Sequence, residues 1–203
     1  MSGRNIKNII VALSVSASLL LTGCDEEAII KEASGSLPIL KYSNDGAHHK
    51  NIRSDLERAG VRVANWVYGG SHAIQAHDRY YTSIDRQSMI DYTAWFKGTF
   101  QSIIRAGGEA FDCDNVAFLY RHGLSAASVK NKQSKEILCG VVMVKHVHDF
   151  GGILSNGSKD DPVLHGLNIV KTDYGWYIVE PQTGKWCPLD SYPNKDYIFR
   201  IIF

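Results

Sequence analysis

The clearest pattern along the chain is an apolar stripe between residues 85 and 105. Its apolar side chains recur at spacings of three and four, the period of a helix that buries one face. They are Met89, Tyr92, Phe96, Phe100 and Ile103. Ser83 or Asp85 is available as the N-cap, and Gly107-Gly108 follows the last apolar position. The pattern predicts one amphipathic helix over residues 85–105.

A second helix is expected to begin at Asp112. The segment after it carries apolar residues at helical spacing, namely Val116, Ala117, Leu119 and Tyr120. Glycine is favoured just beyond the end of a helix, so we predict that this helix closes at Gly123.

The C-terminal half of the chain has the composition of strands. Residues 137–147 are rich in valine and isoleucine, and residues 197–203 alternate between the two sides of an extended chain. Residues 167–171 and 176–179 flank the turn sequence Asp173-Tyr174-Gly175 and therefore predict a hairpin.

Helices followed by antiparallel strands are typical of an α+β domain. We therefore expect residues 51–203 to form one domain in which N-terminal helices pack on an antiparallel sheet. Residues 61–68 are open to two interpretations: they alternate like a strand, and they are equally consistent with the end of a helix that begins near Ser54.

The first 23 residues have the features of an export signal. Arg4 and Lys7 precede a short apolar run over residues 9–21 that is too short to span a membrane. The run ends at Leu21-Thr22-Gly23-Cys24, which resembles the bacterial lipobox, where the cysteine is acylated and becomes the mature N-terminus. The alternative is a buried N-terminal helix. Asp25, in the position after the lipidated cysteine, favours retention at the inner membrane facing the periplasm.

The lipid would make the membrane one partner of the chain, with residues 24–50 as a polar tether. The chain has 22 basic and 21 acidic residues, and cleavage would remove only Arg4 and Lys7 among them. A mature chain so close to neutral gives no indication of a nucleic-acid partner.

Cysteine counting favours one free thiol. With Cys24 assigned to lipid, Cys113, Cys139 and Cys187 remain, an odd number for an oxidising compartment. The simplest assignment leaves Cys113 reduced and pairs Cys139 with Cys187 in a disulfide. The alternative is three buried, reduced cysteines.

Cys113 lies where a thiolate is favoured. If Asp112 is the N-cap, the sulfur lies near unpaired backbone N–H groups and the positive end of the helix dipole. The carboxylates of Asp112 and Asp114 oppose this effect, so activation requires a histidine partner. The alternative interpretation is a small apolar residue packed against the stripe around Phe96.

His165 is the preferred histidine because it precedes a strand whose partner strand returns a carboxylate. If residues 172–175 form the turn, Lys171 pairs with Trp176, and Glu180 lies diagonal to His165 on the same face. The carboxylate can then fix the imidazole tautomer. A three-residue loop would instead turn Glu180 to the opposite face.

The segment His146-Val147-His148 is a rival cluster, because it places two imidazoles on one strand face at a spacing suited to zinc. No third ligand is evident in the sequence. We therefore interpret this segment as a strand end and expect neither a metal nor an organic cofactor.

These runs resemble the transglutaminase-like and papain-like cysteine peptidase superfamily. Residues 112–119 are similar to the cysteine helix of that family, and residues 165–181 are similar to its histidine strand, turn and acid strand. The resemblance implies Cys113 as nucleophile, His165 as general base and acid, and Glu180 as the orienting carboxylate. The Glu180-Pro181-Gln182 form resembles the papain-like domain of a fungal agglutinin, and Gly107-Gly108-Glu109 stands where papain-like enzymes have a glutamine.

The function implied is thiol acyl transfer by a membrane-anchored lipoprotein. Its substrates would be peptide or isopeptide amides in proteins or peptidoglycan of the cell envelope, and the enzyme would be a cysteine hydrolase or transglutaminase. The alternative is a catalytically inactive papain-like fold that serves as an envelope or phage-encoded binding or exclusion lipoprotein.

Overall fold

The computed structural model describes residues 36–61, 74–75, 80–106, 112–133, 135–152 and 163–203. The predicted signal, Cys24, Asp25, Gly107-Gly108-Glu109 and most of residues 61–68 lie outside these ranges. Among the described residues, no helix is both long and apolar enough to cross a bilayer.

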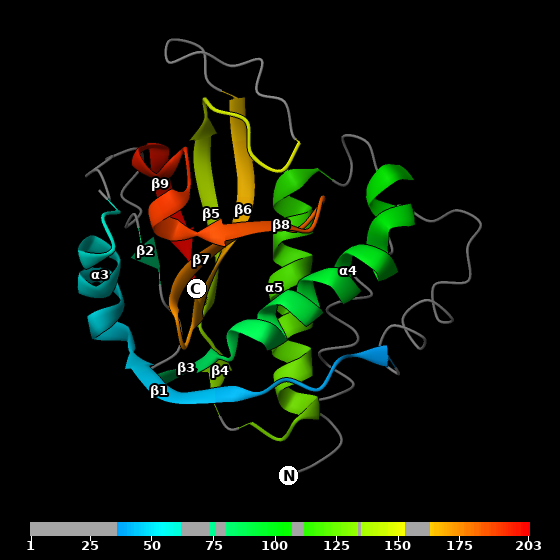
Figure 1. Cartoon of the computed structure of the whole chain (residues 1–203), viewed down its shortest axis with the longest axis vertical. Helices are drawn as coiled ribbons and strands as arrows, with labels where there is room; N and C mark the ends of the chain where they lie inside the picture. The colour runs from blue at the N-terminus through cyan, green and yellow to red at the C-terminus, as the bar shows by residue number, and fades with distance from the viewer. Residues whose placement is uncertain (1–35, 62–73, 76–79, 107–111, 134, 153–162) are drawn as a thin grey trace.

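The described strands form one curved mixed sheet (Figure 1). Its order is β1-β3-β6-β5-β9-β2, with β4 added to β3, β7 paired with β6, and β8 paired with β7. The bounds are β1 Tyr42–His48, β2 Ile74–Gln75, β3 Tyr80–Ile84, β4 Glu136–Ile137, β5 Cys139–His146, β6 Val163–Thr172, β7 Gly175–Glu180, β8 Lys185–Pro188 and β9 Ile198–Ile202. Three pairings are parallel, β2 with β9 and β3 with both β4 and β6, and the others are antiparallel.

Helices lie on both sides of this sheet. In Figure 1, α3 (His49–Arg58) is on one side, and α4 (Arg86–Ala106) and α5 (Cys113–Lys130) are on the other. Each side has its own apolar core because alternate strand residues point to opposite faces. Leu167, Ile169 and Ile178 join the core beneath α3, whereas Val170, Tyr177 and Val179 join the core beneath α4 and α5.

The helix predicted over residues 85–105 is confirmed as α4. The backbone N–H of Ser88 donates to Asp85 Oδ1 at 3.0 Å, so Asp85 is the cap. Met89, Tyr92 and Phe96 are fully buried. The apolar stripe therefore forms the contact surface of this helix.

The predicted start of the next helix is confirmed, but its predicted end is wrong. Asp112 is the N-cap of α5, and the helix continues past Gly123 to Lys130. A Cβ at Gly123 would occupy the position of the Tyr92 hydroxyl, which donates to the Tyr120 carbonyl at 3.0 Å. Gly123 thus permits close packing of α4 on α5 and does not terminate the helix.

The hairpin register is the one predicted. Lys171 pairs with Trp176 and Thr172 with Gly175, so Asp173 and Tyr174 form a two-residue turn. Gly175 has φ of +117°, a conformation that a residue with a Cβ rarely adopts. With this register, Glu180 lies on the same face as His165.

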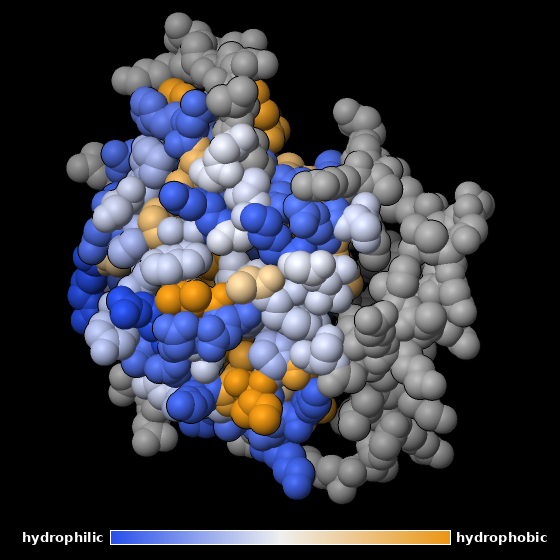
Figure 2. All heavy atoms as spheres, turned by 45° about the vertical axis from the view of Figure 1, so that its right-hand side comes forward, coloured by the Kyte–Doolittle hydropathy of each residue, from blue (hydrophilic) through white to orange (hydrophobic). Residues whose placement is uncertain are grey.

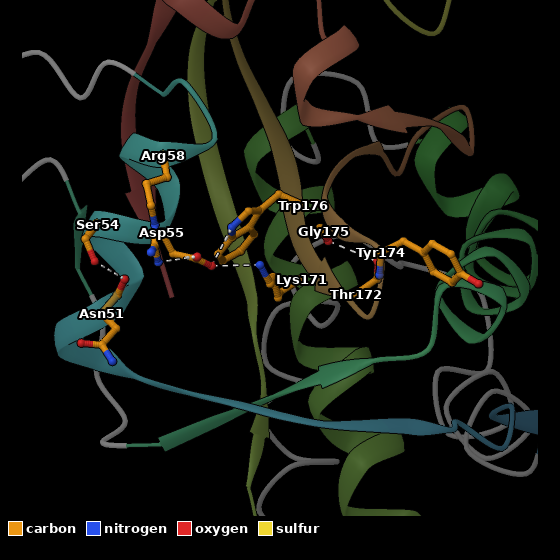
Figure 3. Close-up of polar contacts among 9 residues, drawn as sticks. All are labelled: Asn51, Ser54, Asp55, Arg58, Lys171, Thr172, Tyr174, Gly175 and Trp176. Atoms are coloured by element: carbon orange, nitrogen blue, oxygen red, sulfur yellow. Dashed lines mark hydrogen bonds and ion pairs between the residues drawn. The ribbon is translucent and has the colours of Figure 1, made fainter.

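The turn end of this hairpin holds α3 in place (Figure 3). Asp55 Oδ2 accepts hydrogen bonds from Lys171 Nζ at 2.9 Å and from Trp176 Nε1 at 3.1 Å. Arg58 donates to the other carboxylate oxygen at 3.1 Å. Lys171 also lies over the Trp176 ring, with its nitrogen 5.1 Å from the ring centroid. One carboxylate therefore joins a helix to both strands of the hairpin.

The predicted arrangement of N-terminal helices on an antiparallel sheet is wrong. β1 precedes α3, β3 precedes α4, and β3 runs parallel to β6. β1 also lies inside the predicted tether, so the folded part begins before residue 51. The sequence of β1 is polar and lacks apolar alternation, and its extended shape comes from pairing with β3.

Apolar side chains are dispersed on the visible surface. On the face drawn in Figure 2, small apolar patches are separated by hydrophilic side chains. Among the described residues, the large exposed apolar side chains include Ile39, Leu164 and Tyr174.

Candidate functional site

Cys113, His165 and Glu180 lie together although three different elements carry them. Cys113 opens α5, His165 lies near the start of β6, and Glu180 ends β7. His165 Nε2 and Glu180 Oε2 are 2.5 Å apart. The Cys113 thiol is close enough to the same imidazole to raise its pKa. Since Nε2 faces the carboxylate, Nδ1 is the nitrogen available to the sulfur.

The Glu180 carboxylate is held at both oxygens. Oε2 contacts the imidazole, and Oε1 accepts from the backbone N–H of Gln182 at 3.0 Å. The backbone carbonyl of Glu180 also accepts from Gly184 N–H at 2.8 Å. The carboxylate is fully buried, at 0% exposure. A group held this way fixes the plane of the imidazole.

The charge of His165 depends on its two partners. Burial lowers the pKa of an imidazole, but the interactions of the protonated ring with Cys113 and with the accepting carboxylate of Glu180 outweigh burial and raise the pKa of His165 to about 9. His165 is only 5% exposed. The ring is therefore an imidazolium at neutral pH, next to a half-buried thiol.

Gly166 sets the distance between α5 and β6. A Cβ on Gly166 would lie 2.8 Å from the Asp114 Cα and 3.1 Å from the Cys113 carbonyl carbon. Both are backbone atoms, which cannot move away as a flexible side chain can. The absence of a side chain at Gly166 thus lets the first turn of α5 contact the strand beside His165. The sequence pattern does not predict this role, and the only local signal for it is a glycine directly after the histidine.

Two acids flank the sulfur, as the sequence predicted. Hydrogen bonding to Asp112, with burial as the second cause, raises the pKa of Asp114. Asp112 makes no side-chain capping bond to the helix. The two carboxyl groups therefore interact with each other at the entrance to α5.

The histidine pair considered for zinc has a different arrangement. His146 is buried and stacks on His165, with ring centroids 5.1 Å apart and an interplanar angle of 28°. His148 instead contacts the Tyr197 ring edge-on at 6.2 Å. Within the described part of the chain, no three His, Cys, Asp or Glu side chains are grouped to hold a metal.

The predicted disulfide between Cys139 and Cys187 is absent, and both thiols are free. Cys139 lies on β5 and Cys187 on β8, with β6 and β7 between them. Three strand spacings amount to about 14 Å, whereas a disulfide needs Cα atoms within about 7 Å. The two residues also contribute to cores on opposite faces of the sheet.

The fold is shared with a class of solved structures. Two of them have probability 1.00, TM-score 0.53 and 14% sequence identity to this chain. One is described as "PSL1a-E64 complex", and the other as Polyporus squamosus lectin bound to the human-type influenza-binding epitope Neu5Aca2-6Galb1-4GlcNAc. The match covers 78% of this chain but only 51% and 49% of those chains, so the likeness shows the fold alone. No protein-family model and no curated protein matches the sequence.

These comparisons contradict the predicted superfamily membership, since the similar structures are chains of a lectin and no model of the transglutaminase-like or papain-like family matches. The predicted fold class is corrected on the same finding. The same finding corrects the predicted function, which was acyl transfer on peptide amides by a hydrolase or cysteine peptidase. It also corrects the alternative of an inactive papain-like fold. The structure does bring Cys113, His165 and Glu180 together, and their chemical role stays a prediction.

Proposed function

We propose that the chain is a ligand-binding domain whose site contains a nucleophilic thiol at Cys113. The observation that carries this proposal is the contact of the His165 imidazole with the buried carboxylate of Glu180, with the Cys113 thiol beside the same ring. A thiol held against an imidazole whose other nitrogen contacts a carboxylate is the arrangement that activates a nucleophile. The fold supports binding because its structural neighbours are described as complexes with ligands.

The proposed chemistry is covalent capture of an electrophilic carbon. With its proton already on His165, the sulfur of Cys113 forms a bond to the carbon. The His165 imidazolium then gives the proton on Nδ1 to the atom that receives the displaced electron pair. Glu180 stabilises the imidazolium through Nε2 and remains a carboxylate throughout. The proposal contains no hydrolytic or acyl-transfer step.

The test is the alkylation rate of Cys113 with iodoacetamide, followed by mass spectrometry of the peptide that contains it. We expect His165→Ala to slow alkylation at neutral pH by at least about tenfold, since loss of a positioned base costs that or more. Cys187 is a half-buried thiol whose pKa is raised to about 11 by burial, so its labelling in the same digest is the internal control. Equal, slow labelling of Cys113 in wild type and His165→Ala would remove the proposal.

E64 is the first ligand to test, because one neighbouring structure is described as its complex. If the proposed site binds E64, wild type gains the mass of E64 on the peptide containing Cys113, and Cys113→Ser gains none. Protection of Cys113 from iodoacetamide without a mass gain would indicate non-covalent binding at the same site.

Carbohydrate binding is the second candidate, favoured by the neighbour described in complex with a sialylated trisaccharide. That match spans about half of the neighbour's length, so the sugar need not lie in the shared part. Calorimetric titration with Neu5Aca2-6Galb1-4GlcNAc tests it directly. A saturable binding curve would support this function, and a titration without binding heat would reject it.

A further inference from the structure

The most informative buried group outside the three-residue series is His146, at the end of β5. Its ring is 1% exposed and lies almost parallel to the His165 ring, with centroids 5.1 Å apart. The register explains the contact: Val144 pairs with His165 and His146 pairs with Val163, so the two histidines are diagonal neighbours on one face. One face of the His165 ring is therefore covered by a second imidazole.

The backbone that carries His146 is held from outside the strand. Asn194 Oδ1 accepts from the N–H groups of Val147 at 3.0 Å and His148 at 2.7 Å. Its Nδ2 donates to the His148 carbonyl at 2.6 Å. Asn194 is itself fully buried. This clamp ends β5 directly after His146 and fixes where the ring of that residue lies.

We propose that His146 is a positioning residue of the thiol site: its stacked ring orients the His165 imidazole, and its protonation lowers the reactivity of Cys113 at acid pH. This inference rests on the proposed function of Cys113. Neutral His146 gives an aromatic face to a cationic ring, which is favourable. Protonated His146 would place two positive charges at stacking distance in a buried site, which is unfavourable.

The electrostatic surroundings agree with this assignment. Burial, and then the charge of His165, lower the pKa of His146, and His148 adds to this effect. Asp149 acts in the opposite direction. His146 is thus neutral at neutral pH and gains its proton only below its ordinary titration range.

Other charged groups reach the ring through His165 or from the neighbouring strand. Glu180 on β7 contacts Nε2 at the edge of the His165 ring, and Cys113 on α5 interacts with the same ring. Arg200 on β9 pairs with Met143, further back along β5. Protonation of His146 is therefore opposed mainly by the positive charge of the His165 imidazolium.

The test compares iodoacetamide rates at Cys113 between about pH 5 and pH 8 in wild type, His146→Phe and His146→Ala. Phe keeps a stacked ring but does not titrate. The labelling rate of Cys113 should therefore fall less between about pH 8 and pH 5 in His146→Phe than in wild type, by about threefold or more at pH 5. Ala removes the ring and should slow labelling across the whole range. His122→Phe is the matched control, because burial also lowers the pKa of His122, which stacks on Phe118 instead.

Superimposable pH profiles of wild type and His146→Phe would overturn the inference while leaving the proposed function intact, provided that His165→Ala still slows labelling. If His165→Ala has no effect, the proposed function fails, and the inference fails with it. ¹⁵N NMR of the His146 ring supplies an independent readout: His165→Gln should raise its titration midpoint, because the charge of His165 lowers the pKa of His146, and an unchanged midpoint contradicts the coupling. Where His146→Phe does not fold, His146→Tyr, which also keeps a ring that is uncharged in this pH range, carries the same comparison.

Discussion

Replacing His165 with glutamine should remove a pH-dependent part of the stability of the fold. The unfolded imidazole titrates near 6.5, and its interactions with Cys113 and Glu180 raise the pKa in the folded chain to about 9. The folded state therefore binds the proton more tightly than the unfolded state. The resulting stabilisation is fully present below about pH 6.5 and is lost as pH rises through about 9.

The size of this effect follows from the shift. At about 1.4 kcal/mol per pKa unit, the shift corresponds to about 3 kcal/mol of unfolding free energy between the two pH limits. This conversion is applicable because the imidazole is only 5% exposed. The pKa values of His146 and His122 are lowered, so both residues weaken the fold at acid pH. The shift of His122 is the same in wild type and variant, whereas that of His146 is smaller in the variant because the charge of His165 contributes to it.

The assay is urea unfolding of wild type and His165→Gln at about pH 6 and about pH 10. The wild type should exceed the variant in stability by about 3 kcal/mol more at the acid limit than at the alkaline limit. Glu180→Gln, which keeps the shape of the side chain but removes its charge, should reduce the difference. If the difference in unfolding free energy between wild type and His165→Gln does not change with pH, the conclusion that folded His165 is an imidazolium at neutral pH is refuted.

Three further predictions follow from particular contacts. Gly166→Ala should slow labelling of Cys113 and lower the free energy of unfolding by about 1–3 kcal/mol through overpacking. Its control is Gly98→Ala, in open space on α4, which should be neutral or stabilising by up to about 1 kcal/mol in chemical unfolding. Asp55→Ala should lower stability by about 1–3 kcal/mol, and a double-mutant cycle with Lys171→Met should give a coupling energy distinct from zero. Cys24→Ala should abolish incorporation of radiolabelled palmitate in bacterial cells and release the chain from the membrane fraction; label retained by the variant would contradict the lipobox assignment.

The local features of the fold were predictable from the sequence. The stripe at Met89, Tyr92 and Phe96 defines α4 because helical period and burial coincide there. The turn sequence Asp173-Tyr174-Gly175 left two loop lengths open, and the structure has the two-residue turn, which pairs Lys171 with Trp176. The expected position of Glu180 relative to His165 was a consequence of that register.

Features that depend on distant contacts were not predictable. β1 is polar, and its strand conformation depends on β3, which is far along the chain. The length of α5 was underestimated because Gly123 has the residue type of a helix end, whereas a tyrosine hydroxyl from α4 explains it. The superfamily assignment generalised from short runs around Cys113 to a whole fold, and the comparison with solved structures corrected it.

The site divides in the same way. The three-residue series was reachable because residue type and strand parity are local properties. The close approach at Gly166, the clamp from Asn194 and the stacking of His146 on His165 arise only when separate elements pack together. His146 was considered for metal binding because its spacing to His148 is regular, but the two rings have different neighbours.

The most direct test of the account is the second-order rate constant for alkylation of Cys113 at neutral pH, measured by peptide mass in wild type and His165→Ala. We predict a fast, single-site reaction at Cys113 in wild type, and a rate at least about tenfold lower in the variant, with Cys187 unchanged. Equal rates at Cys113 in the two proteins, no faster than at Cys187, would contradict the central claim that the His165 imidazole activates this thiol.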